Sequence, residues 1–270
     1  ASRLGPPGAA WPELAKVLDA ATVALSAEMV GAADAALRLA TIFATYKLIA
    51  ALGRLADSFA SKGRQFSDIL KIGRTQLQDA VPMTLGQEFH AYAITIREDM
   101  ARLTEALSLL REVNLGGTAI GTGINTDPAY TDIVIARLSD ISGEGIKRSE
   151  NLVEATSDTG AFVMFSGVLK RTAIKLSKIA SDLRLLSSGP RAGFGEINLP
   201  AVQAGSSIMP GKVNPVIPEV VNQAAYLVVG YDVTISMCAE GGQLQLNAFE
   251  PTMGFAIAQG QRLLTNACDT

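Results

Sequence analysis

One ten-residue segment, residues 205–214 (GSSIMPGKVN), gathers side chains that could carry out chemistry. It supplies two hydroxyls, an ammonium group and an amide, from Ser206, Ser207, Lys212 and Asn214. The flanking glycines permit unusual backbone angles and close approach to a ligand, and the prolines prevent an ordinary helix; these are Gly205, Gly211, Pro210 and Pro215. A donor-rich loop of this kind suits holding an anion and moving a proton, although its composition also fits a surface turn.

The segment resembles the signature loop GSSxMPxKxN of the aspartase/fumarase superfamily, and every fixed position of that pattern is present. Further similarity follows at residues 73–89, which resemble the family's second substrate-binding region, and at 117–126, 186–193 and 242–247. Together these matches extend roughly from residue 35 to residue 270. Two positions favour the aspartase branch over the fumarases: Gln76, where fumarases usually carry His, and Gln245.

The resemblance implies a lyase that eliminates ammonia from L-aspartate to give fumarate. Such chemistry removes a weakly acidic proton next to a carboxylate, so the protein must stabilise a carbanion with donors set in advance and must supply a base. The resemblance assigns the base to Ser206, as an alkoxide stabilised by Lys212 and by backbone N–H groups. Lys212 and Asn214 would bind a substrate carboxylate, and Ser207 would add a loop hydrogen bond. Alternatively, Ser206 is a turn hydroxyl and Lys212 an ordinary surface charge.

A second set of residues would come from another subunit. By resemblance, Thr75 and Gln76 meet the other carboxylate of the substrate, and Glu219 supports the position that Gln76 occupies. Each has a simpler interpretation as well. Thr75 and Gln76 could form a cap and a turn, and Glu219 could interact with the dipole of the helix that it begins.

Hydrophobic periodicity predicts an all-α fold, a bundle of five long helices resembling the central domain of the superfamily. The five long helices are predicted at residues 33–70, 84–113, 156–186, 218–239 and 248–267. An Ala-rich helical pattern precedes them at residues 13–29, and a short helix opens at Pro128. We see no strand-like alternation. Residues 1–32 are predicted to be an N-terminal remnant and residues 33–270 the bundle domain, with the signature loop at 203–215.

The composition of the chain indicates which kinds of partner and cofactor to expect. A net charge of −3 gives no reason to expect nucleic acid or a membrane surface. Two cysteines, Cys238 and Cys268, and a single histidine, His90, do not build a zinc site, and we predict reduced thiols in a cytoplasmic protein. The proposed chemistry needs no organic cofactor, and a divalent metal activator finds no ligand cluster in the sequence. Helices that are apolar around much of their circumference, near residues 161–180 and 216–237, favour a homo-oligomer; the resemblance implies a tetramer with active sites shared between three chains.

Two departures from the family pattern stand against activity. Where the family carries an earlier substrate-binding region rich in Ser, Thr and Asn, this chain has Val-Gly-Ala-Ala-Asp-Ala at residues 30–35. The family's small C-terminal domain also finds no counterpart in the given sequence. Two alternatives therefore stay open beside the aspartase prediction: a fumarase that hydrates fumarate to malate, and a truncated, inactive helical assembly protein.

Overall fold

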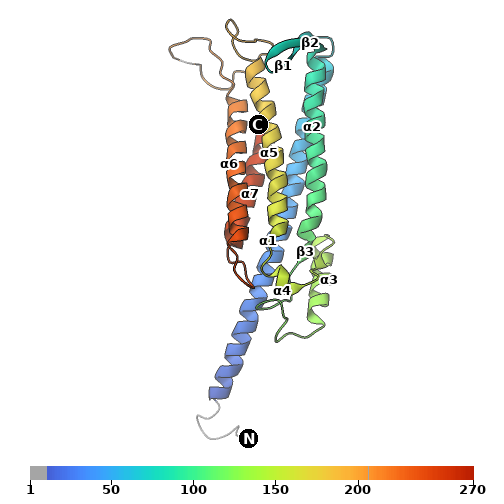
Figure 1. Ribbon diagram of the computed structural model, residues 1–270, viewed down its shortest axis with the longest axis vertical. Coiled ribbons are helices and arrows are strands. Elements are labelled where there is room, and N and C mark those ends of the chain that lie inside the picture. Colours follow the sequence, from blue (N-terminus) through green and yellow to red (C-terminus); the bar gives the residue numbers. More distant parts are fainter. Residues whose placement is uncertain (1–10, 206) are drawn as a thin grey trace. The chain divides into compact units, whose positions relative to one another are not determined.

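The computed structural model describes residues 11–205 and 207–270, with side chains described from residue 31 onward. Ser206, the predicted base, lies outside the described residues. The described part of the chain is dominated by long helices (Figure 1). They are α1 (Trp11–Gln65), α2 (Leu85–Ala106), α5 (Gly160–Leu186), α6 (Val216–Glu240) and α7 (Glu250–Asp269). The predicted all-α class is confirmed.

The boundaries of these helices differ from the prediction in two places. Helix α1 is continuous through residues 30–32, where we predict a break, because alanine and other good helix formers outweigh the single Gly31. Its end comes at Gln65 rather than near residue 70, because the chain then turns into a hairpin.

That hairpin is the element which the sequence analysis missed. Strand β1 (Leu70–Thr75) pairs antiparallel with β2 (Gln78–Thr84). Gln76 and Leu77 form its turn, both with positive φ, 53° and 62°, as tight hairpin turns require. Most of its side chains are exposed on both faces. In β1 the apolar residues Leu70 and Ile72 are exposed, while Lys71 and Gly73 between them are less exposed. The strand therefore lacks the buried apolar face by which a sequence reveals a half-buried strand.

Shorter elements complete the chain. The 3₁₀ helix η1 (Leu107–Arg111) leads into β3 (Glu112–Val113), which pairs in parallel with β4 (Lys147–Arg148). Between these strands lies α3 (Tyr130–Ser142), which ends at Gly143 in the left-handed conformation. Helix α4 (Leu152–Ala155) is capped by the Asn151 side chain, which accepts from two backbone N–H groups.

The chain divides into two compact units. The first comprises Ala1–Ile42, Ser108–Phe162 and Met237–Gly254, and the second comprises Phe43–Leu107, Val163–Ser236 and Phe255–Thr270. The domain boundary that we place after residue 32 stays a prediction.

The first unit packs a small apolar cluster beside a buried ion pair. The cluster consists of Ala35, Val113, Leu115, Ile135 and Ile146. The Nε atom of Arg38 lies 2.9 Å from both carboxylate oxygens of Asp34, and the Arg38 guanidinium lies 4.9 Å from the centroid of the Phe162 ring. Pairing is what makes these two charges tolerable in the interior.

The second unit combines a larger aliphatic core with buried carboxylates. Leu48, Leu52, Ile96, Leu103 and Phe165 are fully buried. Asp232 on α6 accepts hydrogen bonds from Ser166 at 2.8 Å and from Lys170 at 2.5 Å, both on α5. These contacts fix how α5 and α6 pack, and these two helices bracket the predicted signature loop.

One helical stretch in the described residues, Gly31–Gln65, is long and apolar enough to pass as a membrane span, and the core helices of soluble proteins pass the same test. Cys238 and Cys268 are both free thiols.

Candidate active site

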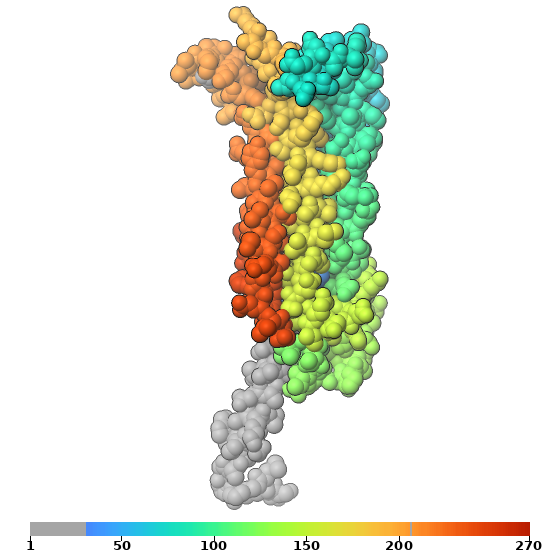
Figure 2. All heavy atoms as spheres, viewed as in Figure 1, coloured from blue at the N-terminus to red at the C-terminus, as the bar shows by residue number. Residues whose placement is uncertain are grey.

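The loop between α5 and α6, residues 187–215, carries most of the predicted site residues. Its first part folds back on the end of α5: the N–H groups of Gly195 and Glu196 donate to the carbonyls of Ser188 and Leu186, at 2.8 and 2.9 Å. Gly193 is required there, because a Cβ atom at that position would lie 2.4 Å from the Ser188 carbonyl carbon. In Figure 2 this loop, coloured gold to orange, stands beside the teal β1–β2 hairpin of the same unit.

The signature segment is itself a closed turn. A Cβ atom placed on Gly205 would lie 3.5 Å from the Lys212 carbonyl oxygen, so the two ends of the segment approach each other. The Lys212 N–H donates to the Met209 carbonyl at 3.2 Å, and Gly211 has a positive φ of 80°. Ser206, next to Gly205 in sequence, lies outside the described residues.

Lys212 and Asn214 line one hollow of about 630 Å³, which we call the loop hollow. Arg184, Ser187 and Ser188 also line it. Lys212, Asn214 and the neighbouring Ser207 are exposed, so their polar groups face solvent. Two cations, an amide and two hydroxyls around one space suit a carboxylate ligand.

The base of the loop hollow is tied to α6. The Arg184 guanidinium donates to the Asn222 side-chain oxygen at 3.1 Å and lies 3.7 Å from the Glu219 carboxylate. The Asn222 amide in turn donates to Ser177 Oγ at 2.8 Å and to Ser181 Oγ at 3.1 Å. Glu219 therefore pairs with Arg184 of its own chain, a contact that the sequence analysis did not predict.

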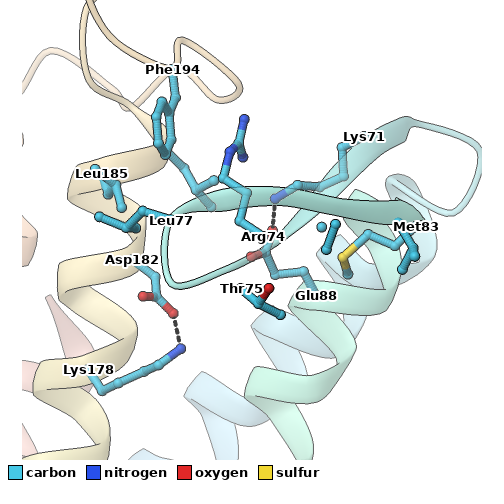
Figure 3. Close-up of a pocket in the computed structure, with 14 residues that line it drawn as sticks. Lys71, Arg74, Thr75, Leu77, Met83, Glu88, Lys178, Asp182, Leu185 and Phe194 are labelled. Carbon is cyan, nitrogen blue, oxygen red and sulfur yellow. Dashed lines mark hydrogen bonds and ion pairs between the residues drawn. The ribbon is translucent and has the colours of Figure 1, made fainter.

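Thr75 and Gln76 lie elsewhere, on the β1–β2 hairpin. Thr75 lines a separate hollow of about 290 Å³, the hairpin hollow, together with Lys71, Arg74 and Phe194 (Figure 3). Gln76 is exposed in the hairpin turn. Within this chain, Thr75 thus lines the hairpin hollow, whereas Gly211, Lys212 and Asn214 line the loop hollow.

Ionic contacts join the hairpin to the loop, and sequence analysis missed them. Glu196 in the loop lies 2.9 Å from Lys71 Nζ and 2.5 Å from an Arg74 nitrogen. Burial alone would raise the pKa of Glu196, but hydrogen bonds and charge from Lys71 and Arg74 outweigh it and hold that pKa below its ordinary value. Arg74 stands inside the recognised segment at residues 73–89, and Lys71 lies two residues before it. Their partner is more than a hundred residues away, so no local signal reveals the contact.

The segment at residues 30–35 is helical, part of α1. Its one ionisable side chain, Asp34, is 1% exposed and is bound by Arg38. The segment therefore resembles packed helix rather than a polar binding loop. Among the described side chains, no group of three potential metal ligands occurs.

Comparison with known proteins shows which family the chain belongs to. Residues 30–230 match the family described as lyase. The chain belongs to this lyase family. Its resemblance to the aspartase/fumarase superfamily is thereby confirmed.

Relatives within the lyase family include aspartate ammonia-lyases of Pseudomonas canavaninivorans, 63% identical over 235 residues, and of Escherichia coli K12, 56% identical over 231 residues. These alignments cover 87% and 86% of this chain but 50% and 48% of the relatives. The chain thus spans about half the length of the curated relatives it matches.

Solved structures of lyase-family proteins share the fold. A structure described as fumarate lyase:delta crystallin from Brucella melitensis bound to cobalt has a TM-score of 0.85 at 63% identity. The class II fumarase of Schistosoma mansoni has a TM-score of 0.84 at 33% identity. Both comparisons cover 87% of this chain, and 51% and 52% of the two solved chains respectively.

Proposed function

We propose that the protein is a carbon–nitrogen lyase that eliminates ammonia from L-aspartate to give fumarate. The observation that carries the proposal is the loop hollow, in which Lys212 and Asn214 of a complete signature segment face a common space beside Arg184. The aspartate ammonia-lyases among the relatives support the choice of aspartate as substrate.

In this proposal Ser206 removes the proton from the carbon next to a carboxylate. Lys212 holds that carboxylate by charge and Asn214 by a directed hydrogen bond, so negative charge that develops on the carboxylate oxygens meets donors already in place. Gly205 and Gly211 let the loop backbone approach the substrate, and Ser207 adds a hydrogen bond within the loop. Ammonia then leaves from the neighbouring carbon, which forms the double bond of fumarate.

The remaining site residues act from a second subunit. Thr75 lines the hairpin hollow rather than the loop hollow, and Gln76 lies in the turn next to Thr75. This separation supports an active site assembled from several chains. Thr75 and Gln76 bind the other carboxylate, and Glu219 supports Gln76 across the interface. A homotetramer in the cytoplasm completes the proposal, with no nucleic acid or membrane partner.

A fumarase is the second candidate, favoured by the similarity to the Schistosoma mansoni enzyme. Gln76, at the place of the usual fumarase His, and Gln245 argue against it. Identity of 63% to an aspartate ammonia-lyase, against 33% to that fumarase, also favours the aspartase proposal.

The test is the appearance of fumarate by ultraviolet absorbance, with L-aspartate and L-malate supplied in separate reactions. Turnover of aspartate alone is the expected result, and turnover of malate alone would replace the proposal with the fumarase candidate. A folded oligomer that turns over neither substrate would favour the inactive assembly protein, the alternative that the apolar segment at residues 30–35 raises.

Ser206→Ala tests the mechanism in the same assay. Loss of a general base lowers turnover by roughly 10²- to 10⁴-fold, while the oligomer should persist. Ser207→Ala is the matched control, because it removes the adjacent hydroxyl and should lower turnover far less. Parental turnover by the Ser206→Ala variant would refute Ser206 as the base.

A further inference from the structure

Glu196 occupies a fixed place at the root of the loop that carries the signature segment. Its backbone N–H donates to the carbonyl of Leu186, the last residue of α5, at 2.9 Å. The next residue, Ile197, donates to the same carbonyl at 3.3 Å. The chain direction into residues 198–214 is therefore set at Glu196, before the segment that bears Lys212 and Asn214 begins.

The Glu196 side chain reaches from this root to the β1–β2 hairpin. One carboxylate oxygen lies 2.5 Å from Arg74 and the other lies 2.9 Å from Lys71. Arg74 also stacks on the loop, with its guanidinium carbon 4.1 Å from the centroid of the Phe194 ring, as Figure 3 shows. We call Lys71, Arg74, Phe194 and Glu196 the hairpin–loop clamp. It joins two strand residues to two loop residues.

Burial makes this clamp stronger than an ordinary surface ion pair. The side chains of Lys71, Glu196 and Arg74 are only 7%, 18% and 21% exposed. Ion pairs that water reaches freely contribute little, whereas a partly buried charge that loses its partner is strongly unfavourable. The Arg74 guanidinium also has two partners at once, the Glu196 carboxylate and the Phe194 ring.

We propose that Glu196 is a positioning residue, which holds the signature loop against the β1–β2 hairpin and so sets the geometry of the substrate-binding groups on both. The inference rests on the proposed function, because it assigns Thr75 on the hairpin and Lys212 on the loop to substrate binding. Thr75 directly follows Arg74, so a displacement of Arg74 moves Thr75 as well. Glu196 touches no substrate in this proposal; it acts through the backbone on either side of the clamp.

Glu196→Gln is the decisive variant, because it keeps the shape of the side chain and removes its charge. Lys71 retains Glu88, 2.5 Å away on α2, so the hairpin keeps an anchor to the helix and the protein should fold. We expect KM for L-aspartate to rise by roughly tenfold while kcat changes by less than about threefold, as when ground-state and transition-state binding weaken together.

Asp232→Asn is the matched control, since it also converts a carboxylate in a partly buried ion pair to an amide. Asp232 pairs with Lys170 between α5 and α6 and contacts neither the hairpin nor the loop in the described structure. Its variant should lower the melting temperature with KM unchanged. An unchanged KM in Glu196→Gln, or an equal rise of KM in both variants, would overturn the proposal.

A double-mutant cycle with Arg74→Gln tests whether the two residues act as a pair. If they do, the combined variant should raise KM by clearly less than the product of the two single changes. Multiplicative effects would mean that Glu196 acts independently of Arg74 and would refute the clamp.

Amide hydrogen exchange gives a measurement that needs no turnover. In Glu196→Gln, the amides of residues 197–214 and of the hairpin should exchange at least about fivefold faster, while those of α2 keep the parental rates, since local opening follows the loss of local contacts. Unchanged exchange in the loop would overturn the clamp even if the parent makes fumarate. If exchange is faster in Glu196→Gln than in the parent, and the parent makes no fumarate, the clamp is supported and the proposed function is refuted.

Discussion

Single side chains in the signature segment have ordinary explanations until their surroundings are known. An exposed loop lysine is usually a solvated charge. Lys212 differs in lining the same hollow as Asn214 and Arg184, so donors converge there rather than scatter. Convergence of this kind is what distinguishes a binding site from a polar surface.

Lys212→Gln should therefore weaken substrate binding more than it affects folding. A hydrogen bond to a charged group contributes about 1.5–3 kcal/mol, which corresponds to a rise of roughly 10- to 100-fold in KM for aspartate. The thermal midpoint should stay within about 2 °C, because Lys212 is exposed. Lys147→Gln, at an exposed lysine of the other unit, is the control. A parental KM in the Lys212 variant would contradict the assignment.

At the scale of the helices, the ionisation of a carboxyl group at a helix end depends on both the helix dipole and burial. Glu250 begins α7 in the first unit. A helix N-terminus favours the ionised carboxylate by about 0.3–1 kcal/mol. Burial opposes ionisation more strongly, with help from the Asp34 charge and against that of Arg38, and raises the pKa of Glu250 to about 7. Burial outweighs the helix dipole at this residue.

Glu250 thus predicts a pH dependence of stability. Its pKa rises from 4.5 to about 7 on folding, so its protonated form stabilises the fold below pH 4.5 and that stability is lost as pH rises through about 7. Glu250→Gln should remove this loss and raise the free energy of unfolding at pH 8 by about 2 kcal/mol, after a discount for partial exposure. Denaturant titrations at pH 5 and pH 8 measure it, with the exposed Glu240→Gln as control. A variant that is no more stable than the parent at pH 8 would contradict the prediction.

Asn222 shows how one side chain secures the helices on both sides of the loop. It is 2% exposed on α6, and its amide donates to Ser177 and Ser181 on α5 while its oxygen accepts from Arg184. Asn222→Ala leaves these groups unpaired, so the free energy of unfolding should fall by roughly 1–3 kcal/mol. Asn266→Ala, at an exposed side chain on α7, should change it much less. Equal losses in the two variants would show that the α5–α6 contacts are not what Asn222 contributes.

At the scale of the whole molecule, the exposed face of α6 needs an explanation. Tyr226 and Val233 are 64% and 60% exposed and lie on the same stripe of the helix. Gly230 lies between them on that stripe, and a Cβ atom placed on it would have no neighbour within 4 Å. Leu227 adds a further exposed apolar side chain at 53%. Exposed apolar side chains grouped along one helix are typical of surfaces that contact another protein, which supports the proposed homo-oligomer.

Val233→Glu should weaken that oligomer, because a charge would be buried at the contact. Sedimentation velocity at equal concentrations should show a shift from the parental species to smaller ones. Ile141→Glu is the control, since Ile141 is an apolar residue that is 84% exposed, more than Val233, near the end of α3. An unchanged distribution in Val233→Glu would place the contact on another surface.

Local sequence determined the long helices of this protein and its family. Helical periodicity predicts the five long helices, because a buried stripe repeats every three to four residues regardless of which helix covers it. The signature segment at 205–214 identifies the family from sequence alone, because its glycines, proline and polar groups all lie within ten consecutive residues. Its glycines and prolines predict a loop, and Lys212 and Asn214 do lie on one.

Tertiary structure alone decided the rest. The β1–β2 hairpin has no buried apolar face, because Leu70 and Ile72 of β1 are exposed, and local sequence therefore does not reveal it. The pairing of Glu196 with Lys71 and Arg74, and of Glu219 with Arg184, joins residues distant in sequence, and no local pattern encodes such a partner. The raised pKa of Glu250 likewise depends on Asp34 and Arg38, which approach it only after folding. Sequence sets which groups are present; the fold sets which of them share a dry or charged space, and that determines their chemistry.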